Sequence, residues 1–507
     1  EQVFIDHAHS LLDEHIDHLR SRIITTANAP STGTGQDELE REALLDNLRL
    51  QLHAAEAARP RTCFGRLRFD GGDDHHIGRI GMRDNAGDVL LIDWRAPQAA
   101  PFYQATNKNP MDVVLRRRIA TRPSPQGPHV THVDDETFDG THEAVDPSLS
   151  AMEAPRSGRM ADILATIASD QDAIIRSDLD QVTIVQGGPG TGKTVVALHR
   201  AAWLLYTHRQ RLARDGVLIV GPSNVFLHYI DQVLPSLGET DVVLLTPRQL
   251  YPDVRPTADD SRDVARIKGS DRMARVVARA VAARVRIPHK GLTLATHTGM
   301  RIRLSSEEIE QASKGISRSR RFHDGRDPFL RRVLQQAARN VARDTGHDPE
   351  DREYCDDLIA SMVEDSTVRR EFNLMWLPTT AERIIGHLLT DASILDEAAT
   401  GILTADERAA LLRPPDAPWT SDDLPLLDEA ADALGPWEPP STAPPDVPDY
   451  RELQASDAYR IRPSHSGGNA GSLADRAIDD REWVYGHVIV DEAQELSAMA
   501  WRAIRRR

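Results

Sequence analysis

The feature that most constrains this fold is the octapeptide Gly-Gly-Pro-Gly-Thr-Gly-Lys-Thr at residues 187–194. It fits the pattern G-x-x-x-x-G-K-[ST] and lies between a β-branched run at 182–185 and a helical pattern at 195–205. In this order, strand, glycine-rich turn and helix form a phosphate-binding loop, because backbone N–H groups surround phosphate oxygens at the positive end of the helix. The octapeptide therefore predicts a parallel α/β sheet with a nucleotide site at its edge.

The residues of this loop have separate expected roles. The ammonium of Lys193 is expected to neutralise the β- and γ-phosphates of ATP, and the hydroxyl of Thr194 is expected to ligate Mg²⁺. The predicted nucleotide-contacting residues of the loop are Gly188, Pro189, Gly190, Thr191, Gly192, Lys193, Thr194 and Val195.

A second motif, at residues 488–494, is a hydrophobic run that ends in acids, Val-Ile-Val-Asp-Glu-Ala-Gln. A strand that ends in a carboxylate places this acid at the carboxyl edge of a parallel sheet, beside the phosphate-binding loop. We expect Asp491 to hold Mg²⁺ directly or through water, and Glu492 to orient and deprotonate the attacking water. Lys193, Asp491 and Glu492 are the predicted catalytic residues of an ATPase that uses ATP and Mg²⁺.

A third candidate is Gln171, sixteen residues before the loop begins. A side-chain amide can form two hydrogen bonds with the N6 and N7 edge of adenine. The alternative is a solvent-facing glutamine on a helix, and the position relative to the loop is the argument for adenine.

Composition narrows the class of protein and partner. The 507 residues predict about two to four domains, and no apolar run approaches the length of a membrane helix. With only two cysteines and no signal-peptide pattern, we expect a cytoplasmic protein without disulfides and without a membrane partner. The formal net charge of −17 disfavours non-specific nucleic-acid binding and favours a partner with a positively charged surface or channel.

Changes of period along the chain predict six segments. They are an antiparallel coiled-coil arm at 1–60, a small β-rich module and linker at 61–150, the first part of the ATPase domain at 151–251, a mostly helical insertion at 252–435, an irregular Pro-rich acidic segment at 436–480, and a return to the ATPase domain at 481–507. The apolar seam of the arm is compatible with two interpretations. Either the seam packs on the rest of the protein, or the arm is a projecting lever that docks on a partner.

Local patterns also predict individual elements. Residues 77–82 and 89–94 flank a turn-rich pentapeptide at 84–88, which indicates a β-hairpin. Three arginines at 116–118 indicate a solvated edge rather than a specific site. Strands are predicted at 182–185, 217–220, 242–245 and 488–490, and helices at 161–176 and 195–205.

Taken together, Gln171, the loop at 187–194 and Asp-Glu-Ala-Gln at 491–494 resemble the ATP site of the UvrD/Rep class of superfamily-one helicases. Further segments are similar to the HelD family, and most of all to its actinobacterial form with the HelR proteins. They are Cys-Phe-Gly-Arg-Leu at 63–67, Ile-Gly-Arg-Ile-Gly at 77–81, Asp-Trp-Arg-Ala-Pro at 93–97, Pro-Phe-Tyr at 101–103, Ala-Leu-His-Arg-Ala-Ala at 197–202, Trp-Thr at 419–420 and Tyr-Gly-His at 485–487. The resemblance implies a RecA-like P-loop sheet with a helical insertion.

The resemblance also implies a partner, the core of bacterial RNA polymerase, bound by a monomer through the β and β′ subunits. Such a factor would clear nucleic acid, and in some forms rifamycin, from the polymerase and recycle stalled complexes, with ATP linked to its own release. The arm would enter the secondary channel and the insertion the main channel. A sigma factor is a further expected contact, and direct nucleic-acid binding is expected to be weak. The segment 436–480 would be either a loop that approaches the polymerase active site or a solvated linker.

Two alternatives stay open, a UvrD/Rep-type DNA helicase or translocase and a polymerase-binding protein whose ATP site only times release. The later helicase motifs, the second RecA-like domain and its arginine finger do not follow Trp501 in this sequence. Because phosphoryl transfer depends on such charge stabilisation, we expect these 507 residues by themselves to hydrolyse ATP slowly.

Overall fold

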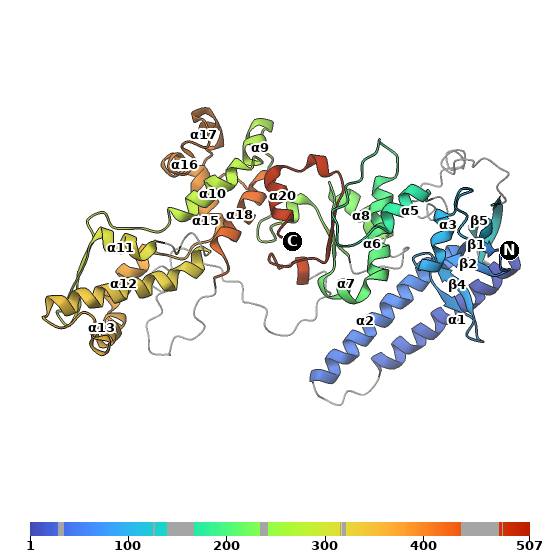
Figure 1. Ribbon diagram of the computed structural model, residues 1–507, viewed down its shortest axis with the longest axis horizontal. Coiled ribbons are helices and arrows are strands. Elements are labelled where there is room, and N and C mark those ends of the chain that lie inside the picture. The colour runs from blue at the N-terminus through green and yellow to red at the C-terminus, as the bar shows by residue number, and fades with distance from the viewer. Residues whose placement is uncertain are drawn as a thin grey trace. The chain divides into compact units, whose positions relative to one another are not determined.

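The computed structural model describes residues 1–28, 35–124, 127–138, 167–233, 242–314, 316, 321–437, 476–478 and 480–507. The chain divides into two compact units. The first comprises Glu1–Pro247, Gly468–Glu495 and Arg507, and the second comprises Arg248–Gly467 and Leu496–Arg506. Figure 1 shows their helices and strands. Across the parts of the chain that the structure describes, no helix combines the length and the apolar character needed to cross a bilayer.

The first unit begins with two long helices, α1 (Gln2–Ala27) and α2 (Gly35–Ala58), followed by a 3₁₀ turn at Arg59–Arg61. Along most of α1 the apolar seam packs against α2, whereas its first turns pack against a sheet. The contacts with α2 join Leu12, Ile16 and Leu19 to Leu48 and Ala55, and those with the sheet join Ile5 and Ala8 to Cys63, Leu91 and Ile119. The seam of α1 therefore packs on the sheet in its first turns and on α2 beyond them, whereas the projecting lever stays a prediction.

A six-stranded sheet follows the arm, with strand order β3-β4-β2-β1-β5-β6. Its strands are β1 (Cys63–Phe69), β2 (Asp74–Gly78), β3 (Met82–Arg83), β4 (Val89–Asp93), β5 (Val113–Ser124) and β6 (Gly127–Thr137). The predicted hairpin around residues 84–88 is present but shorter than expected. Only β3 pairs antiparallel with β4, and Ile77 belongs to β2, which runs parallel to β4. The connection between β4 and β5 contains a 3₁₀ turn (Pro97–Ala99) and α3 (Ala100–Gln104).

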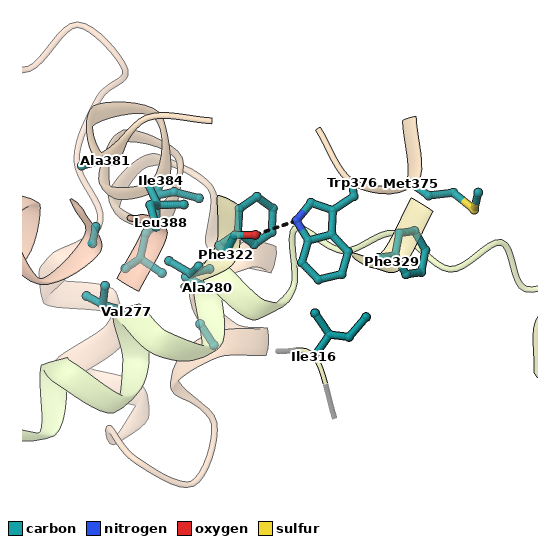
Figure 2. Close-up of a cluster of buried hydrophobic side chains, with 14 of the residues drawn as sticks. Val277, Ala280, Ile316, Phe322, Phe329, Met375, Trp376, Ala381, Ile384 and Leu388 are labelled. Carbon is teal, nitrogen blue, oxygen red and sulfur yellow. Dashed lines mark hydrogen bonds between the residues drawn. The ribbon is translucent and has the colours of Figure 1, made fainter. Parts of the chain in front are cut away.

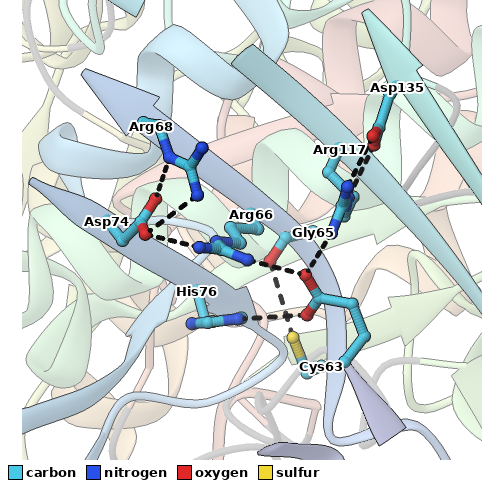
Figure 3. Close-up of polar contacts among 9 residues, drawn as sticks. Cys63, Gly65, Arg66, Arg68, Asp74, His76, Arg117 and Asp135 are labelled. Atoms are coloured by element: carbon cyan, nitrogen blue, oxygen red, sulfur yellow. Dashed lines mark hydrogen bonds and ion pairs between the residues drawn. The ribbon is translucent and has the colours of Figure 1, made fainter. Parts of the chain in front are cut away.

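The three arginines at 116–118 lie on β5 opposite acidic residues of β6, with Arg116 facing Glu136 and Arg117 facing Asp135. The prediction of a solvated edge is wrong for Arg116, which is 4% exposed. Its guanidinium donates to the carbonyls of Phe102 and Ala105 as well as to Glu136. The run of arginines by itself could not indicate this burial, because the acidic residues that face it lie about twenty residues further along the chain. Figure 3 shows the neighbouring ion pairs of Arg117, Arg66 and Arg68 on the same sheet.

The first unit also contains a three-stranded parallel sheet with order β11-β7-β8. Its strands are β7 (Val217–Val220), β8 (Val242–Leu245) and β11 (His487–Val490), and the helices beside them in sequence are α5 (Ser169–Ile175), α6 (Lys193–Thr207), α7 (Arg209–Asp215) and α8 (Asn224–Val233). The three strands were predicted from their β-branched runs. Of the helix predicted at 161–176, residues 161–166 lie outside the described part, and α5 begins at Ser169.

The strand predicted at 182–185 is wrong. These residues have no assigned secondary structure, no described strand pairs with them, and Val182 and Ile184 are 92% and 81% exposed. A β-branched run favours an extended backbone, whereas a strand also requires a neighbour for its N–H and C=O groups. The run at 182–185 lacks such a neighbour among the described residues and therefore forms no strand.

The second unit is mainly helical, and its insertion also contains a short antiparallel hairpin, β9 (Leu292–Ala295) with β10 (Arg301–Leu304), which the helical pattern did not predict. Its helices are α9 (Arg262–Lys268), α10 (Arg272–Ala282), α11 (Ser306–Ser313), α12 (Phe322–Asp344), α13 (Arg352–Glu364), α14 (Ser366–Met375), α15 (Ala381–Thr390), α16 (Ala392–Ala399), α17 (Ala405–Leu411), α18 (Leu424–Leu434) and α20 (Ala498–Ile504), with 3₁₀ turns at Pro247–Gln249 and Ser421–Asp423. The predicted irregular segment 436–480 lies mostly outside the described residues.

Trp376 is a centre of the core in this second unit (Figure 2). The ring is fully buried, with ring centroids 5.3 Å from Phe322 and 5.0 Å from Phe329. Its indole N–H donates to the Phe322 carbonyl at 3.0 Å, so its polar atom is satisfied. Gly325 of α12 lies against the ring, where a Cβ atom would be 2.9 Å from it. Helix α12 therefore needs a glycine at this position.

Candidate active site

The loop at residues 187–194 turns sharply into α6. Gly190 and Gly192 have φ of 77° and 86°, in the left-handed region that other residues rarely adopt. Gly192 has a second constraint, since a Cβ atom there would lie 3.1 Å from Nε2 of Gln171. Helix α6 begins at Lys193, so its positive end lies at this loop.

Lys193 is held by the loop itself. Its ammonium donates to the carbonyl oxygens of Gly187 and Gly188, both at 2.9 Å. The hydroxyl of Thr191 donates to the same Gly188 carbonyl at 2.9 Å. These acceptors are neutral dipoles, so they orient the ammonium without cancelling its charge. A cation in this state at a helix N-terminus is suited to contact a phosphate group.

The acidic motif lies beside the loop. The hydroxyl of Thr194 is 2.8 Å from Oδ2 of Asp491, although 297 positions separate the two residues. Asp491 follows β11 directly, and its N–H donates to the carbonyl of Val220 at 2.9 Å, which extends the pairing of β11 with β7 by one residue. The parallel register therefore places the carboxylate at the carboxyl edge of the sheet.

These two oxygens have the chemistry and spacing of a magnesium site. Mg²⁺ takes oxygen ligands in octahedral geometry, and two neighbouring ligands of such an ion lie about 3 Å apart. The observed 2.8 Å between the Thr194 hydroxyl and the Asp491 carboxylate matches that separation. The pair therefore fits Mg²⁺.

Glu492 has φ of 50°, which is unusual for a residue with a side chain. Its N–H donates to Oδ1 of Asp491 at 3.0 Å, and the amide of Gln494 donates to its carboxylate. Backbone strain of this kind often accompanies functional positions because it fixes the direction of a side chain. The two adjacent carboxylates thus have different side-chain partners, Thr194 for Asp491 and Gln494 for Glu492.

Gln171 lies on α5 and contacts the loop directly. Its amide nitrogen donates to the carbonyl of Thr191 at 3.1 Å, and its amide oxygen accepts from the N–H of Ala168 at 3.1 Å. An amide offers two donor hydrogens and two lone pairs, so these contacts use half of its capacity. The remaining half is the one donor and one acceptor that pairing with an adenine edge would require.

The structure thus brings Gln171, the loop and the acidic motif together. Val195 differs from the other predicted contacts. Its side chain is buried, and its carbonyl contacts Nδ1 of His199 at 2.7 Å, so only its backbone N–H could face a ligand. Pro189 is exposed and has no described polar contact.

The sequence analysis missed the polar residues behind the site. Asp172, next to Gln171, is fully buried and ion-paired with Arg176 at 2.9 Å. On α6, the ring of His199 packs edge-to-face on Trp94 at 5.3 Å, and burial lowers the pKa of His199 to about 4. His199 is therefore neutral near pH 7. Two segments carried the available signal, Asp-Trp-Arg-Ala-Pro at 93–97 and Ala-Leu-His-Arg-Ala-Ala at 197–202, but at the level of sequence they indicated only a family resemblance and no role in the site.

Comparisons with known proteins agree with part of this picture. Residues 1–148 match the family profile described as DNA helicase IV HelD, N-terminal domain. A stretch of 67 residues is 39% identical to the 3'-5' exoribonuclease HELZ2 of Mus musculus. This stretch covers 11% of the present chain and 2% of the mouse protein, so the chain spans a small part of that relative's length.

Proposed function

From a chain whose residues 1–148 are the N-terminal domain of the DNA helicase IV HelD family, we propose that this protein is a Mg²⁺-dependent ATPase with a RecA-like P-loop domain of the superfamily-one helicase type. The main support is the contact between Thr194 and Asp491 at 2.8 Å. It joins a phosphate-binding loop to an acid-ended strand across 297 positions, the pairing that phosphoryl transfer from ATP requires.

Each residue of the site then has a defined role. The Lys193 ammonium would contact the β- and γ-phosphates. The Thr194 hydroxyl and the Asp491 carboxylate would hold Mg²⁺, which would supply positive charge to neutralise the phosphates. Glu492 orients a water molecule and accepts its proton, and the amide of Gln494 fixes the Glu492 carboxylate. Gln171 contacts the adenine edge, with its amide plane held by Thr191 and Ala168.

The partner that we propose is the core of bacterial RNA polymerase, from which ATP turnover would help to clear nucleic acid and to release the protein itself. The net charge of −17 supports a partner whose channels are lined with cations. The paired helices α1 and α2 support an arm that enters such a channel. The family's description as a helicase supports the alternative, a UvrD/Rep-type enzyme that acts on DNA directly.

The nucleotide site is tested by binding of a fluorescent ATP analogue to the 507-residue chain, with Mg²⁺ and with EDTA. We expect Mg²⁺ to increase the affinity for the ATP analogue. Asp491→Asn should reduce this increase at least about tenfold, because one charged ligand of Mg²⁺ is lost. Asp491→Asn and the wild type should bind alike in EDTA. The matched control is Asp70→Asn, at an exposed aspartate of the same unit, which should bind like the wild type. Magnesium-independent binding, or an unchanged Asp491→Asn variant, would refute the assignment.

The partner is tested separately with immobilised polymerase core and single-stranded DNA at physiological salt, with and without ATP. We expect nucleotide-sensitive binding to polymerase and weak binding to DNA. Strong DNA binding without polymerase binding would favour the helicase alternative.

A further inference from the structure

Asp172 is a buried carboxylate that joins the candidate nucleotide site to the N-terminal domain. It is 0% exposed and lies on α5, next to Gln171. Its Oδ2 accepts a hydrogen bond from Nε2 of Gln104 at 2.7 Å, and Gln104 is the last residue of α3 in the domain at 1–148. Arg176, which directly follows α5, forms an ion pair with the same carboxylate.

Arg176 extends this contact to a second point of the N-terminal domain. Its guanidinium donates to the carbonyl of Trp94 at 2.8 Å and to that of Arg95 at 3.2 Å. Both carbonyls belong to the segment at 93–97, where Trp94 is fully buried. Two separate parts of the domain, at 94–95 and at 104, therefore hold one short helix.

Helix α5 is fixed at its carboxyl end by Ile175, which is fully buried in the same apolar cluster as Leu198 and Ala201 of α6. It spans seven residues, Ser169–Ile175, too few for a stable isolated helix. At its carboxyl end, Arg200 of α6 donates to the carbonyls of Ile174 and Ile175 at 3.0 and 3.2 Å. At its amino end, where Gln171 lies, Gln104 and Asp172 provide the corresponding anchor.

We propose that Asp172 and Gln104 are positioning residues through which the N-terminal domain holds Gln171 in place for the adenine base. This proposal rests on the proposed function and deepens it, because it assigns base selectivity to contacts outside the ATPase sheet. The physical reason is the cost of moving the carboxylate. A buried charge without its partners is strongly unfavourable, so Asp172 and its helix stay where Gln104 and Arg176 satisfy it.

The geometry also explains why Gln171 is sensitive to such an anchor. Its amide contacts the loop through one hydrogen bond of 3.1 Å to Thr191, next to Gly192, where a Cβ atom would lie 3.1 Å from the amide nitrogen. A small rotation of α5 would break that bond and turn the amide away from the base. The phosphate contacts of Lys193 and Thr194 belong to α6 and would not change.

The test uses the 507-residue chain and the Mg²⁺ complexes of ATP, inosine triphosphate and inorganic triphosphate, with affinities measured by calorimetry. Inosine carries an oxygen in place of the adenine amine, so it removes the group that Gln171 contacts. We expect the wild type to prefer ATP to inosine triphosphate. Methionine is similar in size to glutamine but lacks the donor. Gln104→Met should therefore weaken the binding of ATP about five- to tenfold and leave the affinities for the other two ligands unchanged. Gln98→Met, at an exposed glutamine of the neighbouring 3₁₀ turn, is the matched control.

A double-mutant cycle separates positioning from a general structural role. Gln171→Met should lose the preference for ATP, and adding Gln104→Met should weaken ATP no further, because both changes remove the same contact. Additive losses, or an equal loss for all three ligands, would overturn the proposal. If Gln104→Met lowers the melting temperature strongly, Gln104→Asn replaces it with the same expectations.

Failure of this proposal and failure of the nucleotide site give different results. If the wild type does not bind any of the three ligands, the proposed function is wrong. If the wild type binds ATP but does not prefer it to inosine triphosphate, or if Gln104→Met keeps the wild-type preference, only the positioning role is wrong.

Discussion

Two lysines of this protein each contact oxygen atoms of the fold, and the two sets of oxygens differ in charge. In the second unit, Lys268 is 1% exposed, and its ammonium lies 2.7 Å from Asp260 and 2.8 Å from Asp423, both carboxylates. In the first unit, Lys193 contacts two backbone carbonyls at 2.9 Å. The charge of Lys268 is therefore neutralised within the fold, whereas that of Lys193 is only oriented.

This difference separates structural charges from functional ones. A buried ammonium is tolerated when carboxylates and hydroxyls surround it, and Thr420 adds a hydrogen bond to Lys268 at 3.2 Å. A cation that must attract a phosphate group should instead keep its charge available. Thr194 and Asp491 resemble Lys193 in this respect. They contact each other, and both could still bind an external cation.

The largest expected effect comes from the same substitution at both lysines. Lys268→Met removes the cation of Asp260 and leaves Asp423 with Arg413 alone, at 2.6 Å, so we expect the second unit to lose about 3–5 kcal/mol of unfolding free energy. Lys193→Met should leave stability unchanged and weaken Mg²⁺–ATP binding at least about 100-fold, since a charge-assisted phosphate contact is removed. Hydrogen exchange of α9 and α10 measures the first effect, and calorimetric titration with ATP measures the second.

The distinction between the two lysines is contradicted if Lys268→Met does not lower stability or if Lys193→Met does. A stable Lys268→Met variant would mean that its acidic neighbours are satisfied without it. A destabilised Lys193→Met variant would show that the loop, too, depends on its lysine for folding.

A smaller effect is expected at Glu1, whose carboxylate accepts from Arg66 at 3.0 Å and from Arg117 at 2.9 Å and contacts His76 at 3.2 Å. Burial by itself would raise the pKa of Glu1, but Arg117, Arg66 and His76 outweigh it and lower the pKa to about 2. A lowered pKa stabilises the fold above the ordinary pKa of a glutamate and loses that stabilisation as the pH falls toward 2.

Glu1→Gln should therefore be less stable than the wild type by about 2–3 kcal/mol near pH 7, and the difference should shrink below about pH 4.5. Urea unfolding of both proteins at several pH values measures it. A difference that does not change with pH would mean that Glu1 acts through its shape and not through its charge.

The smallest effect is expected at the exposed pair between the two arm helices, Arg20 and Glu56, which lie 2.7 Å apart with side chains 54% and 40% exposed. Solvent and salt screen such a pair, so Glu56→Gln should change stability by less than about 1 kcal/mol. Leu12→Ala, in the buried seam of the same arm, should cost about 2–5 kcal/mol and serves as the comparison. Thermal unfolding measures both, and a larger loss for Glu56→Gln would show that charge and not apolar packing holds the arm together.

The sequence was sufficient for features that are encoded within a few consecutive residues. The strands at 217–220, 242–245 and 488–490 and helix α6 follow from local periodicity, and the structure agrees with these predictions. The left-handed turns at Gly190 and Gly192 follow from the glycines themselves. The candidate residues of the loop and of the acidic motif could be named for the same reason, because each motif is a short run of the chain.

Only the tertiary structure decided which of these pieces meet. The pair of motifs predicted that Asp491 lies beside the loop, but the burial of Arg116 opposite Glu136 and the link from Asp172 to Gln104 join residues 20 and 68 positions apart that no motif connected. No local pattern encodes such partners, because a side chain is buried or exposed according to what packs against it. The run at 182–185 is an example in which a local pattern was not sufficient. Its sequence favours an extended backbone, but a strand also requires a neighbouring strand, which the run itself does not encode.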